Sequence, residues 1–345
     1  MGRVVERFDI FPFLEPAREL IRDEKALLSP AVPPPVGIRW DPIPPLRVAH
    51  FAQEFQDKQF SPPRILWEGA SGRIEWQQMN FRQPMYHRNL DVDEMSFQIH
   101  GPRTLMTEIG TVELRPGDLV RIPVGVAHDN WGRRASHILW YFPAPITEVG
   151  HVIREGEVLI PPFEGWQPET VNEVHTNCLG GRAVSVRPGP QHCDTAVQRS
   201  DETLLLEQAY SETDRLRVLH PESSGNGTAW VWQGPDHWIG LTSTTDTDGR
   251  TYTRHRNVDE VQYQVDGTRL LVSANGVVEM TPGTFVHLPV GVAFASIVAG
   301  TSTHVTTLSR GALECVYDGA TESATWTAEE IDAFRERVAP VSAVA

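Results

Sequence analysis

Short stretches in which apolar and polar residues alternate run along most of the chain, separated by turns rich in glycine and proline. The segment ILWEGASGRIEWQQMNF, from Ile65 to Phe81, predicts two short strands joined by a turn. Two further strands are expected at 204–206 and 216–219, within a connecting region that is too long to be a simple loop. The alternation therefore predicts a protein that is mainly β.

Two segments have the pattern of helices instead. Between Leu14 and Leu28, apolar residues are spaced so that several of them share one face of a helix. A proline-rich stretch, SPAVPPPVG, follows and predicts an extended arm. Near the end of the sequence, Thr327 precedes Glu330 by three residues, the pattern of a capping box at the start of a helix. We expect these few helices to lie outside the β core.

The chain also contains an internal repeat. Three segments of the first half recur in the second: LWEG as VWQG, HRNLDVDEMSFQIHG as HRNVDEVQYQVDG, and RPGDLVRIPVGVAH as TPGTFVHLPVGVAF. The offset is 165 residues from Trp67 to Trp232 and 166 residues from Glu94 to Glu260. A register this constant indicates a duplicated domain. We expect one unit at 1–150, with the leading helix and the arm, and another at 151–345, with the connecting region and the final helix.

Composition narrows the classes of function. The net charge of −15 and the absence of a long basic run exclude a nucleic-acid-binding protein. Neither a membrane span nor the apolar segment of a secretory signal is present, so we expect a cytoplasmic protein, acting as a homo-oligomer on a small molecule. The three cysteines are too scattered for a disulfide framework or a thiolate metal site.

The strongest chemical signal is a set of metal-ligand side chains in the first repeat. His87 and Glu94 lie seven residues apart in a strand-like segment, and His128 follows after a Pro-x-Gly turn. Two imidazoles and a carboxylate suit Fe(II), Mn(II) or Zn(II) better than a metal that prefers thiolates. Spacing this wide requires the ligands to meet across paired strands rather than on one helix.

In the second repeat most of these ligands are replaced. Thr253 stands where the first repeat has His87, and Phe294 stands where it has His128, so that only Glu260 persists. His255 takes the position of Asn89. His287 falls at the position of a strand residue, Arg121, and is not expected to rebuild a site. We therefore expect one metal, in the first unit only.

The segment before His128 resembles the second sequence motif of the cupin superfamily. That motif is a Gly, five residues, Pro-x-Gly, two residues and His, matched here by Gly117, Pro123, Gly125 and His128. The resemblance implies a jelly-roll β-barrel. Together with the repeat, it implies two such barrels, an architecture called a bicupin.

The opening of the first motif is similar to the metal motif of homogentisate 1,2-dioxygenase. The matching residues are His87-Arg88-Asn89, Glu94 and Gly101. In that family two His and one Glu bind Fe(II), which would carry over to His87, Glu94 and His128. This chain has four residues between Asn89 and Glu94 where the family has three, so that Asp91 or Asp93 is an alternative carboxylate ligand.

The resemblance implies an Fe(II)-dependent dioxygenase that cleaves a dihydroxylated aromatic ring with O₂. Homogentisate-, gentisate- and hydroquinone-like substrates all remain open. Candidates for the groups that orient the substrate or move protons are Arg88, Asn89, His137 and His255. The alternatives are an isomerase, epimerase or decarboxylase that uses Mn(II), Zn(II) or Ni(II) as a Lewis acid, and a bicupin that binds small molecules without catalysis.

Overall fold

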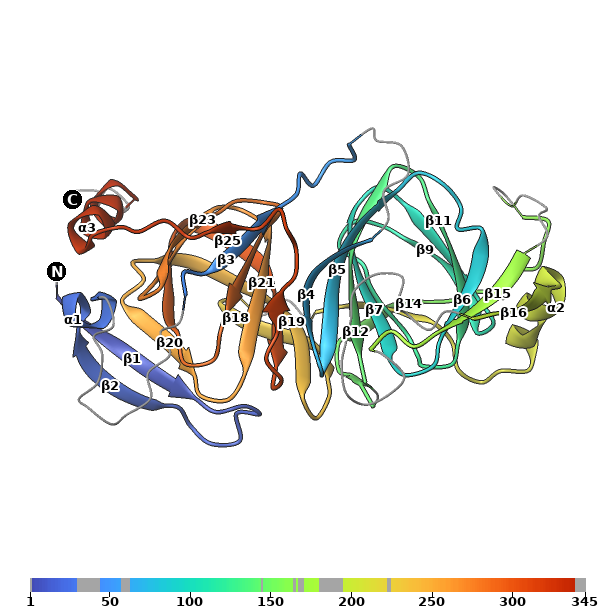
Figure 1. Ribbon diagram of the computed structural model, residues 1–345, viewed down its shortest axis with the longest axis horizontal. Helices are drawn as coiled ribbons and strands as arrows, with labels where there is room; N and C mark the ends of the chain where they lie inside the picture. Colours follow the sequence, from blue (N-terminus) through green and yellow to red (C-terminus); the bar gives the residue numbers. More distant parts are fainter. Residues whose placement is uncertain are drawn as a thin grey trace.

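The computed structural model describes residues 2–29, 44–56, 63–143, 145–163, 166, 171–179, 195–221 and 225–338. Two β-barrels lie side by side, and the few helices lie at the periphery (Figure 1). The fold is all-β and consists of two β-barrels, as the sequence predicted. The proline-rich arm falls almost entirely outside the described residues. None of the described helices has both the length and the apolar character needed to cross a membrane.

The first barrel is built from two facing sheets between residues 64 and 142. Its strands are β4 (Arg64–Gly69), β5 (Gly72–Met79), β6 (Met85–Asn89), β7 (Asp93–His100), β8 (Arg103–Thr107), β9 (Gly110–Leu114), β10 (Leu119–Ile122), β11 (Ala127–Gly132) and β12 (Ala135–Phe142). The two strands expected in the segment from Ile65 to Phe81 are β4 and β5.

The second barrel repeats this order. Its strands are β18 (Gly227–Gln233), β19 (His237–Thr247), β20 (Thr251–His255), β21 (Asp259–Asp266), β22 (Arg269–Ser273), β23 (Gly276–Met280), β24 (Thr284–Leu288) and β25 (Ala293–Ser309). The single long strand β25 takes the place of both β11 and β12, because it pairs with β20 at one end and with β21 at the other.

The register of pairing is the same in both barrels. Glu94 of β7 lies opposite Ile122 of β10, and Glu260 of β21 lies opposite Leu288 of β24. His87 lies opposite His128, just as Thr253 lies opposite Phe294. The expected equivalence of the two repeats is therefore confirmed, including the loss of both histidines from the second.

Each barrel is completed by strands from the other half of the sequence. The hairpin β1 (Arg3–Asp9) and β2 (Arg18–Asp23) joins β20, and β3 (Arg47–His50) joins β24. Reciprocally, the hairpin β15 (Val171–Thr176) and β16 (Thr195–Ser200) joins β6, and β17 (Arg217–His220) joins β10. Shorter strands extend this exchange: β13 (Thr147–Glu148), β14 (His151–Glu155) and β26 (Glu314–Cys315). The short strand β27 (Thr321–Glu322) pairs with β3 in the sheet of the second barrel.

The two barrels therefore exchange strands across residue 150, the expected boundary between the two units. The leading segment of the first half covers the second barrel, and residues 171–179 and 195–220 of the second half cover the first. The physical reason is that β6 and β20 each have an edge with unpaired backbone groups, and the hairpin of the other half satisfies them. Alternation within a strand does not reveal which edge that strand will join.

Two of the sequence assignments are wrong. The helix expected from Leu14 to Leu28 is helical only in α1 (Glu24–Leu28), since 18–23 form β2 beside β1 and Asp23 caps the helix by accepting from the Ala26 amide. The strand expected at 204–206 is part of α2 (Glu202–Glu207), which continues as the 3₁₀ turn η1 (Gln208–Tyr210). Asp201 caps α2 by accepting from the Leu204 amide, a signal that the apolar run obscured.

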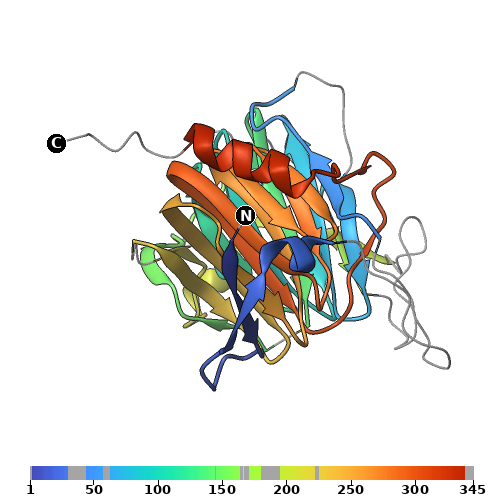
Figure 2. The same cartoon turned by 90° about the vertical axis from the view of Figure 1, so that its left-hand side faces the viewer.

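The strand expected at 216–219 is β17, and the helix at the end of the sequence is α3 (Ala328–Val338). The capping box is present: the Glu330 amide donates to Thr327 Oγ1 at 3.2 Å, and the Thr327 amide donates to Glu330 Oε2 at 2.6 Å. Helix α3 lies across the outside of the second barrel near α1 (Figure 2). It buries Ile331 among the side chains of that barrel.

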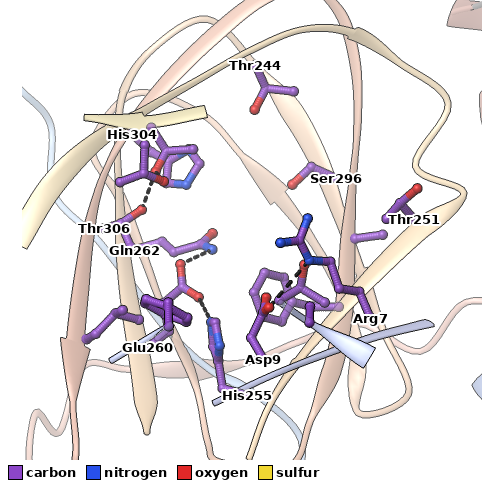
Figure 3. A pocket seen from close by; sticks show the side chains of 18 of the residues that line it. Arg7, Asp9, Thr244, Thr251, His255, Glu260, Gln262, Ser296, His304 and Thr306 are labelled. Atoms are coloured by element: carbon purple, nitrogen blue, oxygen red, sulfur yellow. Dashed lines mark hydrogen bonds and ion pairs between the residues drawn. The ribbon is translucent and has the colours of Figure 1, made fainter. Parts of the chain in front are cut away.

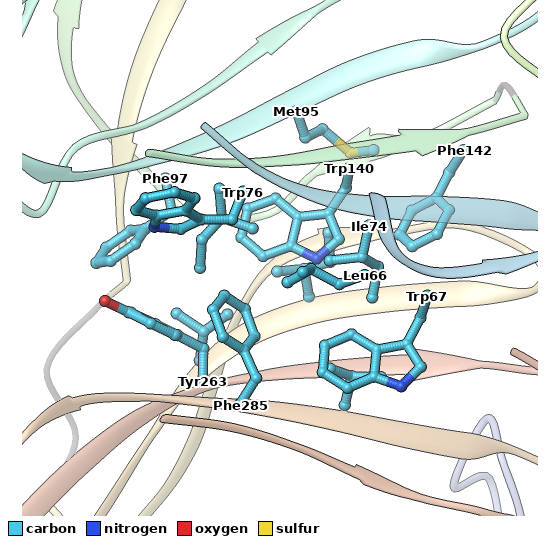
Figure 4. Packing of buried hydrophobic residues seen from close by; sticks show 14 of the residues in the cluster. Leu66, Trp67, Ile74, Trp76, Met95, Phe97, Trp140, Phe142, Tyr263 and Phe285 are labelled. Carbon is cyan, nitrogen blue, oxygen red and sulfur yellow. The ribbon is translucent and has the colours of Figure 1, made fainter. Parts of the chain in front are cut away.

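One hydrophobic core is shared between the barrels. It contains Trp67, Trp76 and Trp140 from the first barrel and Trp232, Tyr263 and Phe285 from the second (Figure 4). The Trp140 indole also donates across the junction to Thr307 Oγ1 at 3.0 Å. Side chains of this size dominate packing energy where they are fully buried. The junction is therefore packed like the interior of a single domain.

Candidate metal centre

The three predicted ligands meet inside the first barrel. His87 on β6 and His128 on β11 are directly opposite each other, and Glu94 lies on β7 of the facing sheet. Their ligand atoms lie within 4.8 Å of one another, and His128 Nε2 is 3.3 Å from Glu94 Oε2. Within the described residues, this is the one cluster of three side chains with metal-ligand geometry.

The turn before His128 positions its side chain. Gly125 has φ of +84°, a conformation that side chains with a Cβ rarely adopt. The turn is fixed by its amide, which donates to the Asn89 carbonyl, and by the Val124 amide, which donates to Asp93 Oδ1 at 2.7 Å. Both partners belong to the segment that carries the other two ligands, so the motifs lock one another in place.

The electrostatics of the site suit a cation. Burial alone would raise the pKa of Glu94, but the attraction and hydrogen bond of His128, together with His87 and Asn89, hold it at about 2. The carboxylate is thus ionised at neutral pH, the form in which it binds metals. Glu94 in turn raises the pKa of His128 against the opposing effect of burial. A bound cation would take the place of the proton that this pair attracts.

Neither alternative carboxylate belongs to the cluster. Asp91 accepts from the amides of Cys178 and Leu179, at 2.8 and 2.9 Å. Asp93 accepts from Arg121 Nη1 at 3.0 Å as well as from the Val124 amide. Both acids stabilise the turns around the site through these hydrogen bonds. Glu94 is therefore the carboxylate that faces the two histidines.

Of the two polar neighbours of His87, only one contacts the cluster. Asn89 Nδ2 donates to Glu94 Oε2 at 3.0 Å and so orients the carboxylate. Arg88 projects to the other side of its strand, where it binds Glu173 at 2.6 Å and Glu108 at 2.7 Å. Arg88 therefore fastens the exchanged hairpin to the barrel and does not line the cavity, contrary to its selection as a catalytic candidate.

His137 and His255 lie in different barrels. His137 lines the same cavity as the metal cluster, and its Nε2 is 3.2 Å from Gln77 Oε1. Burial and the nearby Arg103 lower its pKa well below 6.5, so its imidazole is neutral. His255 instead lies in the second barrel, bonded to Glu260 at 2.8 Å. Its selection for the first site was wrong, because the repeat places it in a separate cavity.

The cavity around the cluster has a volume of about 460 Å³. Sequence reasoning missed its other polar groups: Arg73 and Glu75 of β5, 2.7 Å apart, and Tyr141 of β12, whose ring lies under the Arg73 guanidinium. Arg73, Glu75 and Gln77 alternate along β5 and all line the cavity. The sequence did contain a signal for these groups. The charged residues of this strand alternate with Ile74 and Trp76, so that one face of the strand is polar and the other apolar.

The exchanged hairpin supplies the remaining wall. Val174, Thr176 and Cys178 line the cavity although they lie 46 to 91 residues beyond the ligands in the sequence. The Cys178 thiol donates to Asn89 Oδ1 at 3.1 Å, which places it behind the residue that orients Glu94. Nothing in the local pattern of 171–179 connects it to the metal motif, so the sequence offered no signal for this contact.

No protein-family model matches the sequence, and no curated protein is similar to it. Solved structures with a similar fold include a cupin 2 conserved barrel domain protein from Leptotrichia buccalis (7% identity, TM-score 0.43), which matches over 73% of this chain and 92% of that one. AerE from Microcystis aeruginosa is 8% identical, with a TM-score of 0.42 over 72% of this chain and 96% of its own. Oxalate decarboxylase from Bacillus subtilis, described with Mn(II) centres, is 11% identical, with a TM-score of 0.43 over 80% and 81%.

Proposed function

We propose that the protein is an Fe(II)-dependent dioxygenase that opens the ring of a dihydroxylated aromatic compound. The observation that carries the proposal is the cluster of two His and one Glu at the wall of a buried cavity. Such a ligand set binds one face of an iron ion and supplies adjacent open positions for a chelating substrate and for O₂.

The residues of the cavity suit an aromatic substrate with ionisable oxygens. Ile65, Met85 and Leu139 provide an apolar surface for the ring. The neutral imidazole of His137 can accept a hydrogen bond from a phenol that enters the cavity, because it carries one free lone pair. Arg73, paired with Glu75 at 2.7 Å, places a guanidinium in the cavity wall, where it can donate a hydrogen bond to a substrate oxygen.

Glu94 and Asn89 keep the cluster in a fixed orientation. The Asn89 amide holds one oxygen of Glu94, and the Cys178 thiol holds the Asn89 carbonyl. A chain of hydrogen bonds behind a ligand raises its metal affinity because less order is lost on binding. The exchanged hairpin and the residues that follow it close one side of the cavity with Val174, Thr176 and Cys178.

The test is oxygen uptake by protein loaded with Fe(II) and, in parallel, with Zn(II), over a panel of gentisate, homogentisate, hydroquinone and their alkyl and halogen derivatives. We expect uptake with at least one compound in the iron form alone, since Zn(II) has no redox chemistry. His128→Ala should abolish the uptake, and His100→Gln, outside the cavity, should retain it. Turnover that persists without oxygen and with Zn(II), Mn(II) or Ni(II) would instead identify a Lewis-acid isomerase, epimerase or decarboxylase.

A further inference from the structure

The second barrel has lost the metal ligands and yet contains the larger cavity. Its volume is about 790 Å³, within the range of sites for small molecules. Thr253 and Phe294, which replace the two histidines, both line it. Glu260, the counterpart of Glu94, also lies in the wall (Figure 3). A barrel that served only for packing would be expected to fill this space with apolar side chains.

Hydroxyl groups cover much of the cavity wall. They belong to Thr228, Thr242, Thr244, Thr247, Thr251, Thr253, Ser296 and Thr306. Thr242 is bonded to both Thr228 and Thr306, at 2.8 and 2.6 Å. Ser296 accepts from Arg269 Nη1 at 2.7 Å, so its own proton remains to be donated. Each hydroxyl can donate and accept, and a set of them matches a ligand that carries hydroxyl groups of its own.

His304 is directed into this cavity (Figure 3). It is only 4% exposed, and its Nδ1 has no hydrogen-bond partner among the described residues. Burial and the nearby Arg269 lower its pKa well below 6.5, so the ring is neutral and offers both a donor and an acceptor. An unsatisfied buried nitrogen destabilises the folded protein. A ligand in the cavity would remove that cost.

The charged groups in the wall are already paired. Glu260 accepts from Gln262 at 2.8 Å and is bonded to His255 at 2.8 Å. Arg7 donates to Asp9 at 3.4 Å. The remaining charged residue of the described lining, Glu15, is exposed. The interior therefore favours a neutral ligand, because neither an anion nor a cation would meet an unpaired charge there.

One side of the cavity is aromatic. Phe13 and Trp230 are stacked, with ring centroids 6.4 Å apart and planes inclined by 16°. Phe13 has φ of +62°, an unfavourable conformation for a bulky residue, and is held in it by contacts with Phe11 and Trp238. Residues kept in such conformations cluster at ligand-binding sites. A cavity lined by both aromatic rings and hydroxyl groups fits a ring with an apolar C–H face and polar edges.

We propose that the second barrel is a metal-free binding site for a neutral, polyhydroxylated molecule of the size of a monosaccharide. His304, Ser296 and the threonine hydroxyls bind its hydroxyl groups. Trp230 and Phe13 pack against its C–H face. This site is separate from the metal centre and does not depend on the activity proposed for the first barrel.

The test uses the full chain, both treated with EDTA and loaded with Fe(II). The probes are D-glucose, D-galactose, D-xylose and myo-inositol, with D-glucuronate and D-glucosamine as charged counterparts. Binding is measured by saturation-transfer NMR and by the tryptophan fluorescence to which Trp230 contributes. We expect at least one neutral probe to bind saturably and equally in both forms, and its charged counterpart to bind at least about tenfold more weakly, or ~1.4 kcal/mol.

The repeat provides a matched pair of variants. His304 and His137 occupy equivalent positions, opposite Gln264 and Gln98. His304→Phe should weaken binding of the neutral probe at least about tenfold, and His137→Phe should change it less than about twofold. Thr253→Val, which keeps the shape of the side chain, should weaken it severalfold even if His304→Phe fails to fold. Absence of saturable binding to every neutral probe, or equal loss in His137→Phe, would overturn the proposal.

Discussion

At the residue scale, three acids within four positions have three different roles. Asp91 binds two backbone amides, Asp93 binds Arg121 and a turn amide, and Glu94 faces the histidines. The sequence identified both histidines and the group of acids, because their residue types are those of a metal site. It could not separate the acids, because their roles depend on partners that lie 28 to 88 residues away.

Substitutions of the two adjacent acids should therefore have opposite consequences. Glu94→Gln should lower metal affinity by at least about a hundredfold, because it removes an anionic ligand. Asp93→Asn should leave that affinity within a fewfold of wild type but destabilise the protein by about 1–3 kcal/mol, because Arg121 and the Val124 amide lose an ionised acceptor. Metal titration and urea unfolding of both variants measure this. Loss of metal binding in the Asp93→Asn variant would instead identify Asp93 as the carboxylate ligand.

Asn89 and Arg88 offer a second contrast between neighbours. Asn89→Ala should reduce metal affinity by roughly 10- to 100-fold, as expected when a hydrogen bond behind a ligand is removed. Arg88→Gln should leave metal affinity unchanged, since its partners Glu108 and Glu173 lie outside the cavity. Isothermal titration with Fe(II) or Mn(II) distinguishes the two. Similar affinities in both variants would contradict the orienting role of Asn89.

At the element scale, the sequence predicted which segments are strands better than it predicted their partners. Alternation and the repeat located the barrel strands and their register, because periodicity and turn residues are local properties. The exchange of hairpins was not predictable, because pairing depends on which edges are open in the folded molecule. Strand pairing also explains why the helix expected from Leu14 begins only at Glu24. Residues 18–23 pair with β1 as β2, and this pairing overrides their helical pattern.

The exchanged elements are anchored by buried acids that are equivalent in the two halves. Glu202 of α2 binds Arg82 and Tyr86 of the first barrel, and Glu24 of α1 binds Arg335 and Tyr252 beside the second. Glu202→Gln should loosen the hairpin that closes the metal cavity, with a loss of about 3 kcal/mol for an interrupted buried pair.

Hydrogen exchange of β15 amides and the KM of the proposed substrate should both rise in Glu202→Gln, because residues from β15 line the cavity. Glu24→Gln is the matched control, and should raise exchange in β1 while leaving first-barrel kinetics unchanged. An identical response of β15 in the two variants would show that the hairpins are not anchored separately.

At the scale of the whole molecule, the junction between the barrels contains a histidine that should make stability depend on pH. His237 of the second barrel is stacked on Phe142 of the first, with ring centroids 4.0 Å apart, and burial lowers its pKa from 6.5 to about 4. The unfolded chain takes up this proton near pH 6.5, and the folded protein does so only near pH 4. Stability should therefore fall as the pH drops through this interval.

The protonation of His237 alone should lower the free energy of unfolding by roughly 3 kcal/mol between pH 6.5 and pH 4. His237→Phe should flatten the acid limb of the stability curve, and should not destabilise at neutral pH, because His237 Nε2 has no partner within the described residues. Urea unfolding at pH 7, 6, 5 and 4.5 measures the effect, with the exposed His151→Gln as control. An unchanged slope in His237→Phe would contradict the neutral, buried state of this histidine.

The central claim is that one metal ion binds per chain, in the first barrel, at His87, Glu94 and His128. Elemental analysis of protein reconstituted with Fe(II) without oxygen tests it most directly, using a substitution that the second barrel itself carries. We predict one equivalent in the wild type and none in His128→Phe, the counterpart of Phe294. Two equivalents in the wild type, or one equivalent that survives in His128→Phe, would contradict the account.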